Sequence, residues 1–430
     1  MEQITKPHCG ARLDRLPDCR WHSSMFAIVS FGLLVCWSNA VGGLILAQLK
    51  ELGWTDNSTT ATFSAITTAG MFLGALVGGI IGDKTGRRNA FILYEAIHIA
   101  SMVVGAFSPN MDFLIACRFV MGVGLGALLV TLFAGFTEYM PGRNRGTWSS
   151  RVSFIGNWSY PLCSLIAMGL TPLISAEWNW RVQLLIPAIL SLIATALAWR
   201  YFPESPRWLE SRGRYQEAEK VMRSIEEGVI RQTGKPLPPV VIADDGKAPQ
   251  AVPYSALLTG VLLKRVILGS CVLIAMNVVQ YTLINWLPTI FMTQGINLKD
   301  SIVLNTMSMF GAPFGIFIAM LVMDKIPRKT MGVGLLILIA VLGYIYSLQT
   351  SMLLITLIGF FLITFVYMYV CYASAVYVPE IWPTEAKLRG SGLANAVGRI
   401  SGIAAPYAVA VLLSSYGVTG VFILLGAVSI

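Results

Sequence analysis

Long apolar runs, separated by short polar connections, make up most of the chain. The runs are about 20 residues or longer, which is the length that an α-helix needs to cross the hydrocarbon core of a bilayer. Backbone groups in lipid must be satisfied within the segment, so such runs form helices. Strands of a membrane barrel would instead alternate apolar and polar positions. The pattern therefore predicts an all-α integral membrane protein.

Twelve transmembrane helices are expected, arranged as two pseudo-symmetric bundles of six. Helix 2 is the apolar run that ends at the motif beginning with Gly79, and helix 6 ends near Phe202. The other complete helices are expected at 25–48, 89–107, 112–138, 147–173, 261–287, 300–323, 331–348, 352–380 and 389–414. A twelfth helix begins near Gly420 and is expected to be incomplete, because the sequence given stops at Ile430.

Polar stretches divide the chain into four parts. We expect an N-terminal tail at 1–24, a first six-helix bundle at 25–202, a central loop at 203–260 and a second bundle at 261–430. Within the central loop, Ala218, Met222, Ile225 and Val229 repeat at helical spacing between charged residues. This periodicity predicts an amphipathic surface helix.

The distribution of charge predicts the orientation. Only 12% of the residues are charged, against roughly 25% in soluble domains. The net charge is +9. The connections after helices 2, 4, 6, 8 and 10 hold almost all the Lys and Arg outside the apolar runs, whereas the opposite loops hold only Lys50, Arg181 and Lys299. The positive-inside rule therefore places the N-terminus and the central loop in the cytoplasm. Because topology accounts for the basic residues, no nucleic-acid partner is expected.

The sequence offers little that suggests catalysis or a bound metal. Seven cysteines are present, but no C-x-x-C pair, so neither a disulfide framework nor a zinc site is indicated. There is no nucleophile triad and no Walker loop, and the glycines at 122–126 follow Arg118 in an apolar run rather than a strand. We expect no enzyme activity, no metal and no cofactor.

Two motifs recur in the second half of the chain. The connection Gly79-Ile-Ile-Gly-Asp83-Lys-Thr-Gly86-Arg87-Arg88 returns in altered form as 324–329, and Glu138-x-x-Pro141 returns as Glu380-x-x-Pro383. Both recur at almost the same offset, which indicates an internal repeat. We interpret 79–88 as a loop between two membrane helices.

These motifs and two others resemble the Major Facilitator Superfamily, and within it the sugar-porter-like branch. The other two are Arg118-x-x-x-Gly-x-Gly-x-Gly126 and the segment 203–208, Pro-Glu-Ser-Pro-Arg-Trp. The resemblance extends over the whole chain and is closest to the inner-membrane metabolite transport proteins of enteric bacteria. It implies a rocker-switch transporter whose central site is exposed alternately to each side of the membrane.

The resemblance also implies a cytoplasmic gate, formed by charged motifs that pair across the two halves when that side is closed. The gate residues carried over are Gly79, Asp83, Gly86, Arg87, Arg88, Glu138, Arg145, Glu204, Arg207, Asp324, Arg328, Glu380 and Arg389. The alternative is that these are topology charges whose side chains snorkel to water.

Five ionisable residues lie inside predicted membrane helices, where a charge is costly and usually functional. They are Glu95, His98, Arg118, Arg151 and Arg399. Arg399 is expected either to contact the substrate or to pair with an acid such as Glu95. The resemblance links Arg118 to proton coupling, with a structural role as the alternative. Glu95 and His98 share a helix face. Either they carry a proton, or Glu95 pairs with an arginine and a neutral His98 packs in the bundle. Arg151 lies near the inner end of its helix and either serves substrate binding or coupling or snorkels to water.

The seventh expected helix, at 261–287, carries a polar stripe at Asn277, Gln280, Tyr281 and Asn285, with Trp286 beside it. The spacing places the four on one helix face, and amides avoid lipid, so the stripe is expected to face the cavity. Bonding between helices is the alternative. A hexose is not supported residue by residue, because the positions where hexose porters carry a Gln pair read Ala275-Met276.

The sequence therefore predicts a multi-pass secondary active transporter of the bacterial inner membrane. Its cargo would be a sugar, a polyol or a small organic acid, driven by the proton gradient as a symporter. A uniporter and a non-transporting nutrient sensor remain the alternatives. The expected partners are the small-molecule substrate and the lipid bilayer, and we expect a monomer.

Overall fold

The computed structural model describes residues 7–17, 19–141, 145–240, 254–323, 325–349, 351–382 and 386–429. Within these ranges, only the backbone is described for residues 133, 134, 137, 145, 146, 254, 387–389 and 429.

The first half of the chain is mainly helical. Its helices are α1 (Cys9–Asp14), α2 (Arg20–Val35), α3 (Gly42–Glu51), α4 (Asn57–Thr85), α5 (Arg87–Ala106), α6 (Met111–Tyr139), α7 (Arg145–Asn157), α8 (Ser159–Leu170) and α9 (Ala176–Tyr201). Two further helices, α10 (Pro206–Ser211) and α11 (Tyr215–Thr233), follow in the central loop.

The second half repeats this organisation. It consists of α12 (Tyr254–Leu257), α13 (Gly260–Thr293), α14 (Leu298–Met309), α15 (Gly311–Val322), α16 (Arg328–Ser347), α17 (Met352–Cys371), the π-helix η1 (Tyr372–Tyr377), α18 (Val378–Glu380) and α19 (Lys387–Ser429). The helix α19 bends at Gly417, whose φ of 64° and ψ of −160° are not helical.

Nine helices among the described residues are long and apolar enough to cross a membrane. Two further spans are each split into two helices, α2 with α3 and α7 with α8, and the bend at Gly417 divides α19 into two spans. The all-α class and twelve-helix organisation predicted from the sequence are therefore confirmed.

Three spans predicted as continuous helices are interrupted. The prediction of an unbroken helix at 25–48 is wrong, because the chain forms turns between α2 and α3. The carbonyl of Ser38 in this break accepts a hydrogen bond from the Arg118 guanidinium, so a side chain from α6 replaces a helical donor. The spans at 147–173 and 300–323 break at Trp158 and Phe310, respectively.

The interpretation of 79–88 as a loop is also wrong in detail. The helix α4 continues through Thr85 and α5 begins at Arg87, so only Gly86 separates them. Gly86 has a backbone φ of 98°, a value that residues other than glycine rarely adopt. A Cβ atom at this position would lie 2.2 Å from Oε2 of Glu204. The glycine thus permits both the sharp reversal and the approach of a carboxylate.

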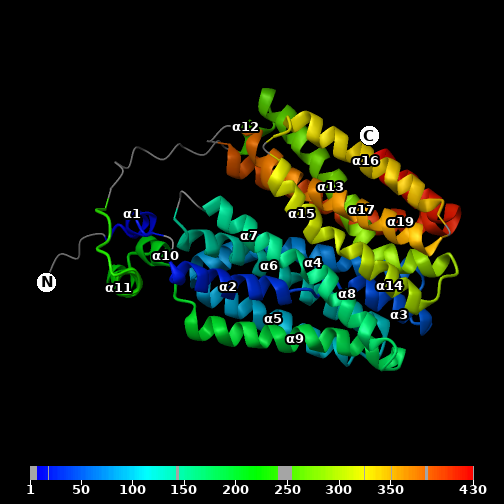
Figure 1. Cartoon of the computed structure of the whole chain (residues 1–430), viewed down its shortest axis with the longest axis horizontal. Coiled ribbons are helices and arrows are strands. Elements are labelled where there is room, and N and C mark those ends of the chain that lie inside the picture. The colour runs from blue at the N-terminus through cyan, green and yellow to red at the C-terminus, as the bar shows by residue number, and fades with distance from the viewer. Residues whose placement is uncertain are drawn as a thin grey trace.

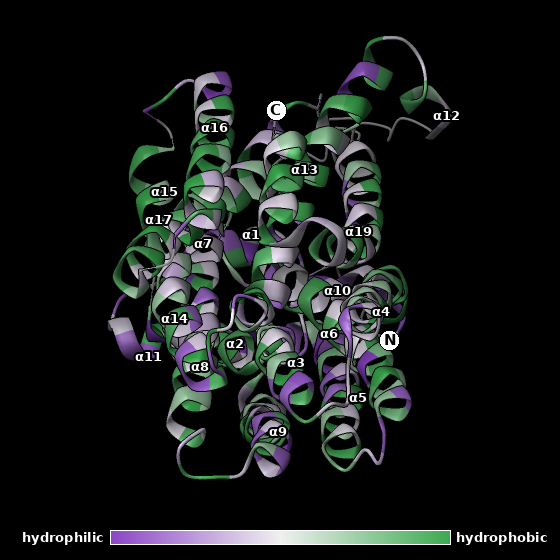
Figure 2. Cartoon of the chain, turned by 90° about the vertical axis from the view of Figure 1, so that its right-hand side faces the viewer, coloured by the Kyte–Doolittle hydropathy of each residue, from purple (hydrophilic) through white to green (hydrophobic). Residues whose placement is uncertain are grey.

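The two halves lie side by side, with α1, α10 and α11 together at one end (Figure 1). We call this the basic end, because the basic residues at the junction of α4 with α5 also lie there. Seen along the long axis from the other end, apolar residues predominate on the membrane helices of both halves (Figure 2). The helix α11 buries Ala218, Met222, Ile225 and Val229 in a cluster with residues of α1 and α10.

Away from the basic end, the halves pack tightly on each other. Gly43 of α3 lies so close to α13 that an added Cβ atom would be 2.5 Å from the carbonyl oxygen of Ile284. The amide of Asn305 in α14 donates a hydrogen bond to the hydroxyl of Ser164 in α8 at 3.1 Å. These contacts join α3 and α8 of the first half to α13 and α14 of the second.

Candidate functional site

A cavity of about 300 Å³ lies between the two halves. Both halves contribute polar side chains to its wall. From the first half these are Asn39, Ser153, Asn157, Ser159 and Tyr160, and from the second half Gln280, Tyr281 and Arg399. Apolar residues such as Leu33, Met71 and Val370 complete the lining. A space of this size and mixed polarity suits one small polar molecule.

Among the described residues that line the cavity, Arg399 is the one cationic side chain. It lies on α19 and is partly buried. Within the described part of the chain, its guanidinium forms no hydrogen bond or ion pair. The sequence-based alternative of an Arg399–Glu95 pair is therefore not realised in this structure, since Glu95 contacts Cys36 and His98 instead. A guanidinium placed in this way is available to an anion or a hydroxyl group.

The polar stripe predicted on α13 divides into three parts. Gln280 and Tyr281 line the cavity. Asn277 is buried and donates its amide to the carbonyl of Leu273 in its own helix at 2.7 Å. Asn285 is buried beside Gly42 of α3. The stripe therefore runs from a helix contact through the cavity to the interface with α3.

Trp286 lies outside the cavity lining. It is fully buried in an apolar cluster that includes Ala61 of α4 and Val409 of α19. Because these helices belong to different halves, Trp286 contributes to the packing of one half on the other.

Sequence reasoning missed the contribution of the first half to the cavity. Asn39 lies in the break between α2 and α3, and Asn157 is the last residue of α7, just before the break at Trp158. The amide of Asn157 donates to the carbonyl of Ser153 at 2.8 Å. The Asn39 side chain makes no hydrogen bond to another residue that the structure describes. The available signal was an amide side chain inside an apolar run, the same signal that identified Gln280.

Arg118 is 1% exposed and is held by neutral groups. Its Nη1 donates to the Ser38 carbonyl at 2.7 Å, and its Nε donates to Oγ1 of Thr67 at 3.2 Å. Its guanidinium carbon lies 4.6 Å from the ring centre of Phe63. Over the described ranges, no carboxylate pairs with it. Arg118 thus ties α6 to α4 and to the break in the first span.

Glu95 and His98 are both fully buried on α5. Nδ1 of His98 lies 3.5 Å from Oε2 of Glu95, and its Nε2 lies 2.7 Å from the Ser38 hydroxyl. The thiol of Cys36, which lines the cavity, lies 3.7 Å from Oε1 of Glu95. A continuous set of polar contacts therefore runs from the cavity wall through Glu95 and His98 to Ser38.

Cys36, Glu95 and His98 are also the one trio of described side chains whose potential ligand atoms lie within 4.8 Å of one another. A closed structural zinc site has four protein ligands. No further His, Cys, Asp or Glu belongs to this group in the described part of the chain. The trio therefore does not form a closed structural site of four protein ligands.

Arg151 is exposed on α7 and is not part of the cavity lining. Its guanidinium carbon lies 5.1 Å from the ring centre of Trp148, one helical turn earlier. This placement resembles a snorkelling cation stacked on an interfacial aromatic residue.

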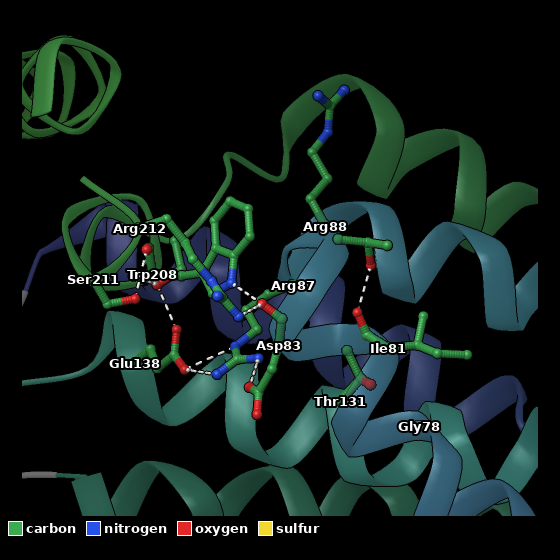
Figure 3. Close-up of polar contacts among 12 residues, drawn as sticks. Gly78, Ile81, Asp83, Arg87, Arg88, Thr131, Glu138, Trp208, Ser211 and Arg212 are labelled. Atoms are coloured by element: carbon green, nitrogen blue, oxygen red, sulfur yellow. Dashed lines mark hydrogen bonds and ion pairs between the residues drawn. The ribbon is translucent and has the colours of Figure 1, made fainter. Parts of the chain in front are cut away.

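Charged residues at the basic end of the first half form one network around Arg87 (Figure 3). The guanidinium pairs with Asp83 at 2.7 Å and with Glu138 at 2.8 Å. The backbone carbonyl of Asp83 accepts a hydrogen bond from the indole of Trp208 at 2.7 Å. Figure 3 shows Arg88 pointing away from this network, and its guanidinium donates to the carbonyl of Trp199.

Glu204 caps the junction between α4 and α5. Its Oε1 accepts hydrogen bonds from the backbone N–H groups of Arg87 at 2.7 Å and of Ser205 at 3.0 Å. Burial raises the pKa of the Glu204 carboxyl group, and these N–H donors oppose that shift. Arg207 continues the network, since it pairs with Asp14 at 2.9 Å and donates to the carbonyl of Glu138 at 3.1 Å.

In the second half, Arg328 pairs with Glu380 at 2.9 Å. Asp324 and the side chains of Arg145 and Arg389 lie outside the described residues. The ion pairs between described gate residues all lie within one half. The structure therefore brings Asp83, Arg87 and Glu138 together, but it does not join them to Arg328 or Glu380.

Comparison with known proteins agrees with this architecture. The profile of the Major Facilitator Superfamily matches residues 26–406. The chain is 44% identical over 429 residues to the inner membrane metabolite transport protein YdjE of Escherichia coli (strain K12), covering 99% of this chain and 94% of YdjE. It is 24% identical to the niacin transporter NiaP of Acinetobacter baylyi (strain ATCC 33305 / BD413 / ADP1), covering 93% and 89% of the two chains.

Among solved structures, the fold is similar to the partially occluded inward open conformation of the xylose transporter XylE from E. coli. The TM-score is 0.73 at 16% identity, covering 96% of each chain. The expected resemblance and multi-pass membrane architecture are confirmed. The chain therefore belongs to the Major Facilitator Superfamily, whose members are membrane transporters rather than enzymes.

Proposed function

We propose that this protein carries a small polar metabolite across the bacterial inner membrane by alternating access and as a proton symporter. The observation that carries the proposal is the cavity between the halves, with Gln280, Tyr281 and Arg399 on one wall and Asn39 and Asn157 on the other. A ligand held between two rigid halves is released when they rock about it.

The packing between the halves supports a direction of access. At the end away from α11, Gly43 contacts Ile284 and Asn305 bonds to Ser164, whereas the gate ion pairs at the basic end stay within each half. By the positive-inside rule, the basic end faces the cytoplasm. This arrangement favours a state in which the cavity is sealed from the outside and opens towards the cytoplasm.

Glu95 and His98 are our candidates for proton coupling. They are buried beside the cavity and connect to it through Cys36. Ionisable residues at such depth are retained mainly where they serve transport. Arg118 would respond to a change of charge there, because Ser38 contacts both Arg118 and His98.

The cargo class rests on Arg399 and the amides. One relative at 24% identity is named for niacin, a small organic acid. We infer that this chain takes a sugar, polyol or organic acid and acts as a monomer, since one chain supplies the whole cavity and both sets of gate residues.

Uptake into proteoliposomes tests the proposal. The purified full chain would be reconstituted and given labelled sugars, polyols and organic acids, with and without an inward proton gradient. We expect concentrative uptake of at least one compound that collapses when the gradient is dissipated. Uptake at the same rate and to the same level with and without the proton gradient would contradict symport and favour a uniporter. Binding without uptake would favour the nutrient sensor.

A further inference from the structure

The two walls of the cavity carry different chemistry. The second half presents a guanidinium, Arg399, with Gln280 and Tyr281. The first half presents neutral groups, namely Asn39, Asn157 and the phenol of Tyr160. One wall therefore suits a negative charge, and the other suits groups that donate and accept hydrogen bonds.

We propose that the cavity selects a polyhydroxylated carboxylate, that is, a sugar acid, with its carboxylate on Arg399 and its hydroxyl groups on Asn39 and Asn157. This inference rests on the proposed transport function and narrows its substrate class. It unites the two features of the cavity that a neutral sugar or a simple organic acid would each use only in part.

A neutral sugar leaves the cationic wall without a counter-charge. Arg399 finds no carboxylate within the described part of the chain, and closing the cavity around a ligand removes water from its guanidinium. A charge taken out of water without a partner is costly, and a carboxylate supplies that partner with matching two-pronged geometry. The guanidinium therefore favours an anion over an uncharged polyol of the same length.

A carboxylate without hydroxyl groups fails at the other wall. The Asn157 amide nitrogen keeps its bond to Ser153. When the cavity closes, however, the Asn157 amide oxygen and the Asn39 side chain lose access to water, and an alkyl chain offers them no hydrogen bond. Sites built to hydrogen-bond a ligand reject analogues that lack the bonding group, because their own polar atoms stay unpaired. The cavity of about 300 Å³ also lies at the small end of the range of ligand pockets, roughly 300–1,000 Å³, which suits a single sugar unit.

The placement of these groups gives the ligand a mechanical role. Arg399 and Gln280 belong to the second half, whereas Asn39 and Asn157 belong to the first. A molecule that carries a carboxylate at one end and hydroxyl groups along its length contacts both halves at once. Such a ligand stabilises the occluded state, in which the halves are closest, more than a ligand that engages only one wall.

Matched six-carbon compounds test this directly. The purified full chain in detergent would be titrated calorimetrically with gluconate, galactonate, glucuronate and galacturonate, and separately with glucose, sorbitol and hexanoate. We expect at least one sugar acid to bind about 10- to 100-fold more tightly than all three comparison compounds, as the loss of a charge-assisted hydrogen bond implies. Equal affinity for glucose, sorbitol or hexanoate would overturn the proposal, as would binding of none of the four acids.

Substitutions locate the two ends of the ligand. Arg399→Gln should lower the affinity for the bound sugar acid by about 10- to 100-fold, and Arg399→Lys should lose less because it retains the charge. Asn157→Ala should lower the affinity for the sugar acid by several fold. Lys264→Gln removes an equal charge at an exposed position and should leave binding unchanged. Full affinity in Arg399→Gln would overturn the assignment.

The outcome is separable from that of the proposed function. If sugar acids bind but no compound enters proteoliposomes, the substrate class stands and the transport proposal fails. If other compounds are transported and no sugar acid binds, the transport proposal stands and the substrate class fails.

Discussion

The Arg118 guanidinium donates a hydrogen bond to the backbone carbonyl of Ser38 at 2.7 Å. This bond joins the first third of α6 to the break between α2 and α3. The hydroxyl of the same serine lies 2.7 Å from Nε2 of His98 on α5. A single residue in a broken helix thus connects the buried arginine with the buried Glu95–His98 pair, and Asn39, the next residue, lines the cavity.

Replacing Arg118 with lysine should destabilise the protein although the charge is kept. Arginine reaches the Ser38 carbonyl and the Thr67 hydroxyl with two different nitrogens while its planar group lies over Phe63. The single ammonium nitrogen of lysine cannot occupy both positions, so a buried acceptor loses its donor. We expect a cost of about 1–3 kcal/mol in the free energy of unfolding. A lower midpoint temperature of thermal unfolding in detergent, relative to wild type, would show this loss of stability.

Thr67→Val serves as the graded comparison. It removes one partner of the Arg118 Nε and leaves the bond to Ser38 in place. Its cost should be smaller, about 0.5–1.5 kcal/mol. If Arg118→Lys unfolded at the wild-type temperature, Arg118 would not be the residue that holds the break in place.

Gly43→Ala should block closure of the two halves at the end away from α11. The added Cβ atom would lie 2.5 Å from the Ile284 carbonyl oxygen and 2.9 Å from that of Asn285, both backbone atoms. Neither half's own core is disturbed, so we expect a folded protein with uptake reduced at least about tenfold, which needs only about 1.4 kcal/mol against closure.

Cross-linking reports this closure directly. Ser164→Cys and Asn305→Cys place thiols where the side chains now meet at 3.1 Å. Adding Gly43→Ala should reduce cross-linking between them. Gly169→Ala on α8, where nothing lies within 4 Å of the added atom, should not. Undiminished uptake and cross-linking in Gly43→Ala would mean that the halves separate easily at this contact.

The helices were predictable from the sequence because the thickness of the hydrocarbon core sets the length of each apolar run. The breaks were not, because they depend on partners distant in the chain. The carbonyl of Ser38 leaves the helical pattern where Arg118 of α6 reaches it. Likewise, Gly86 alone forms the junction read as a loop, because Glu204, far along the chain, caps the first N–H groups of α5.

The cavity was predictable in its second half and not in its first. Arg399, Gln280 and Tyr281 stand out as polar side chains in apolar runs. Asn39 and Asn157 give the same signal, but their role depends on the breaks beside them. Periodicity could not separate Asn277 and Asn285 from Gln280, since one face of a long helix contacts different neighbours along its length.

Gly86→Ala should lower stability where Gly79→Ala does not. At Gly86 an added Cβ atom meets Glu204 at 2.2 Å, and a φ of 98° is strained for alanine. We expect a loss of about 1–3 kcal/mol. Gly79 lies within α4 with nothing within 4 Å of an added Cβ atom, so alanine there should be neutral or stabilising by up to about 1 kcal/mol. Equal unfolding midpoints for the two variants would contradict the role assigned to Gly86.

The docking of α1 on α11 should depend on pH through Glu226. Burial raises the pKa of this carboxyl group, but hydrogen bonds from Arg12 and Arg15 outweigh burial and hold the pKa below its ordinary value. Because the docked pKa is the lower one, the pairing stabilises docking above the ordinary carboxyl pKa and is lost as the pH falls through the docked value. Hydrogen exchange of residues 9–14, corrected for intrinsic rates, should therefore stay slow from neutrality to about pH 4 and accelerate below it.

Glu226→Gln should accelerate exchange already at neutral pH, whereas Glu227→Gln, at an exposed neighbouring position, should not. Identical exchange in wild type and Glu226→Gln across this range would show that the apolar contacts of Cys9, Leu13 and Leu16 hold α1 without the ion pairs.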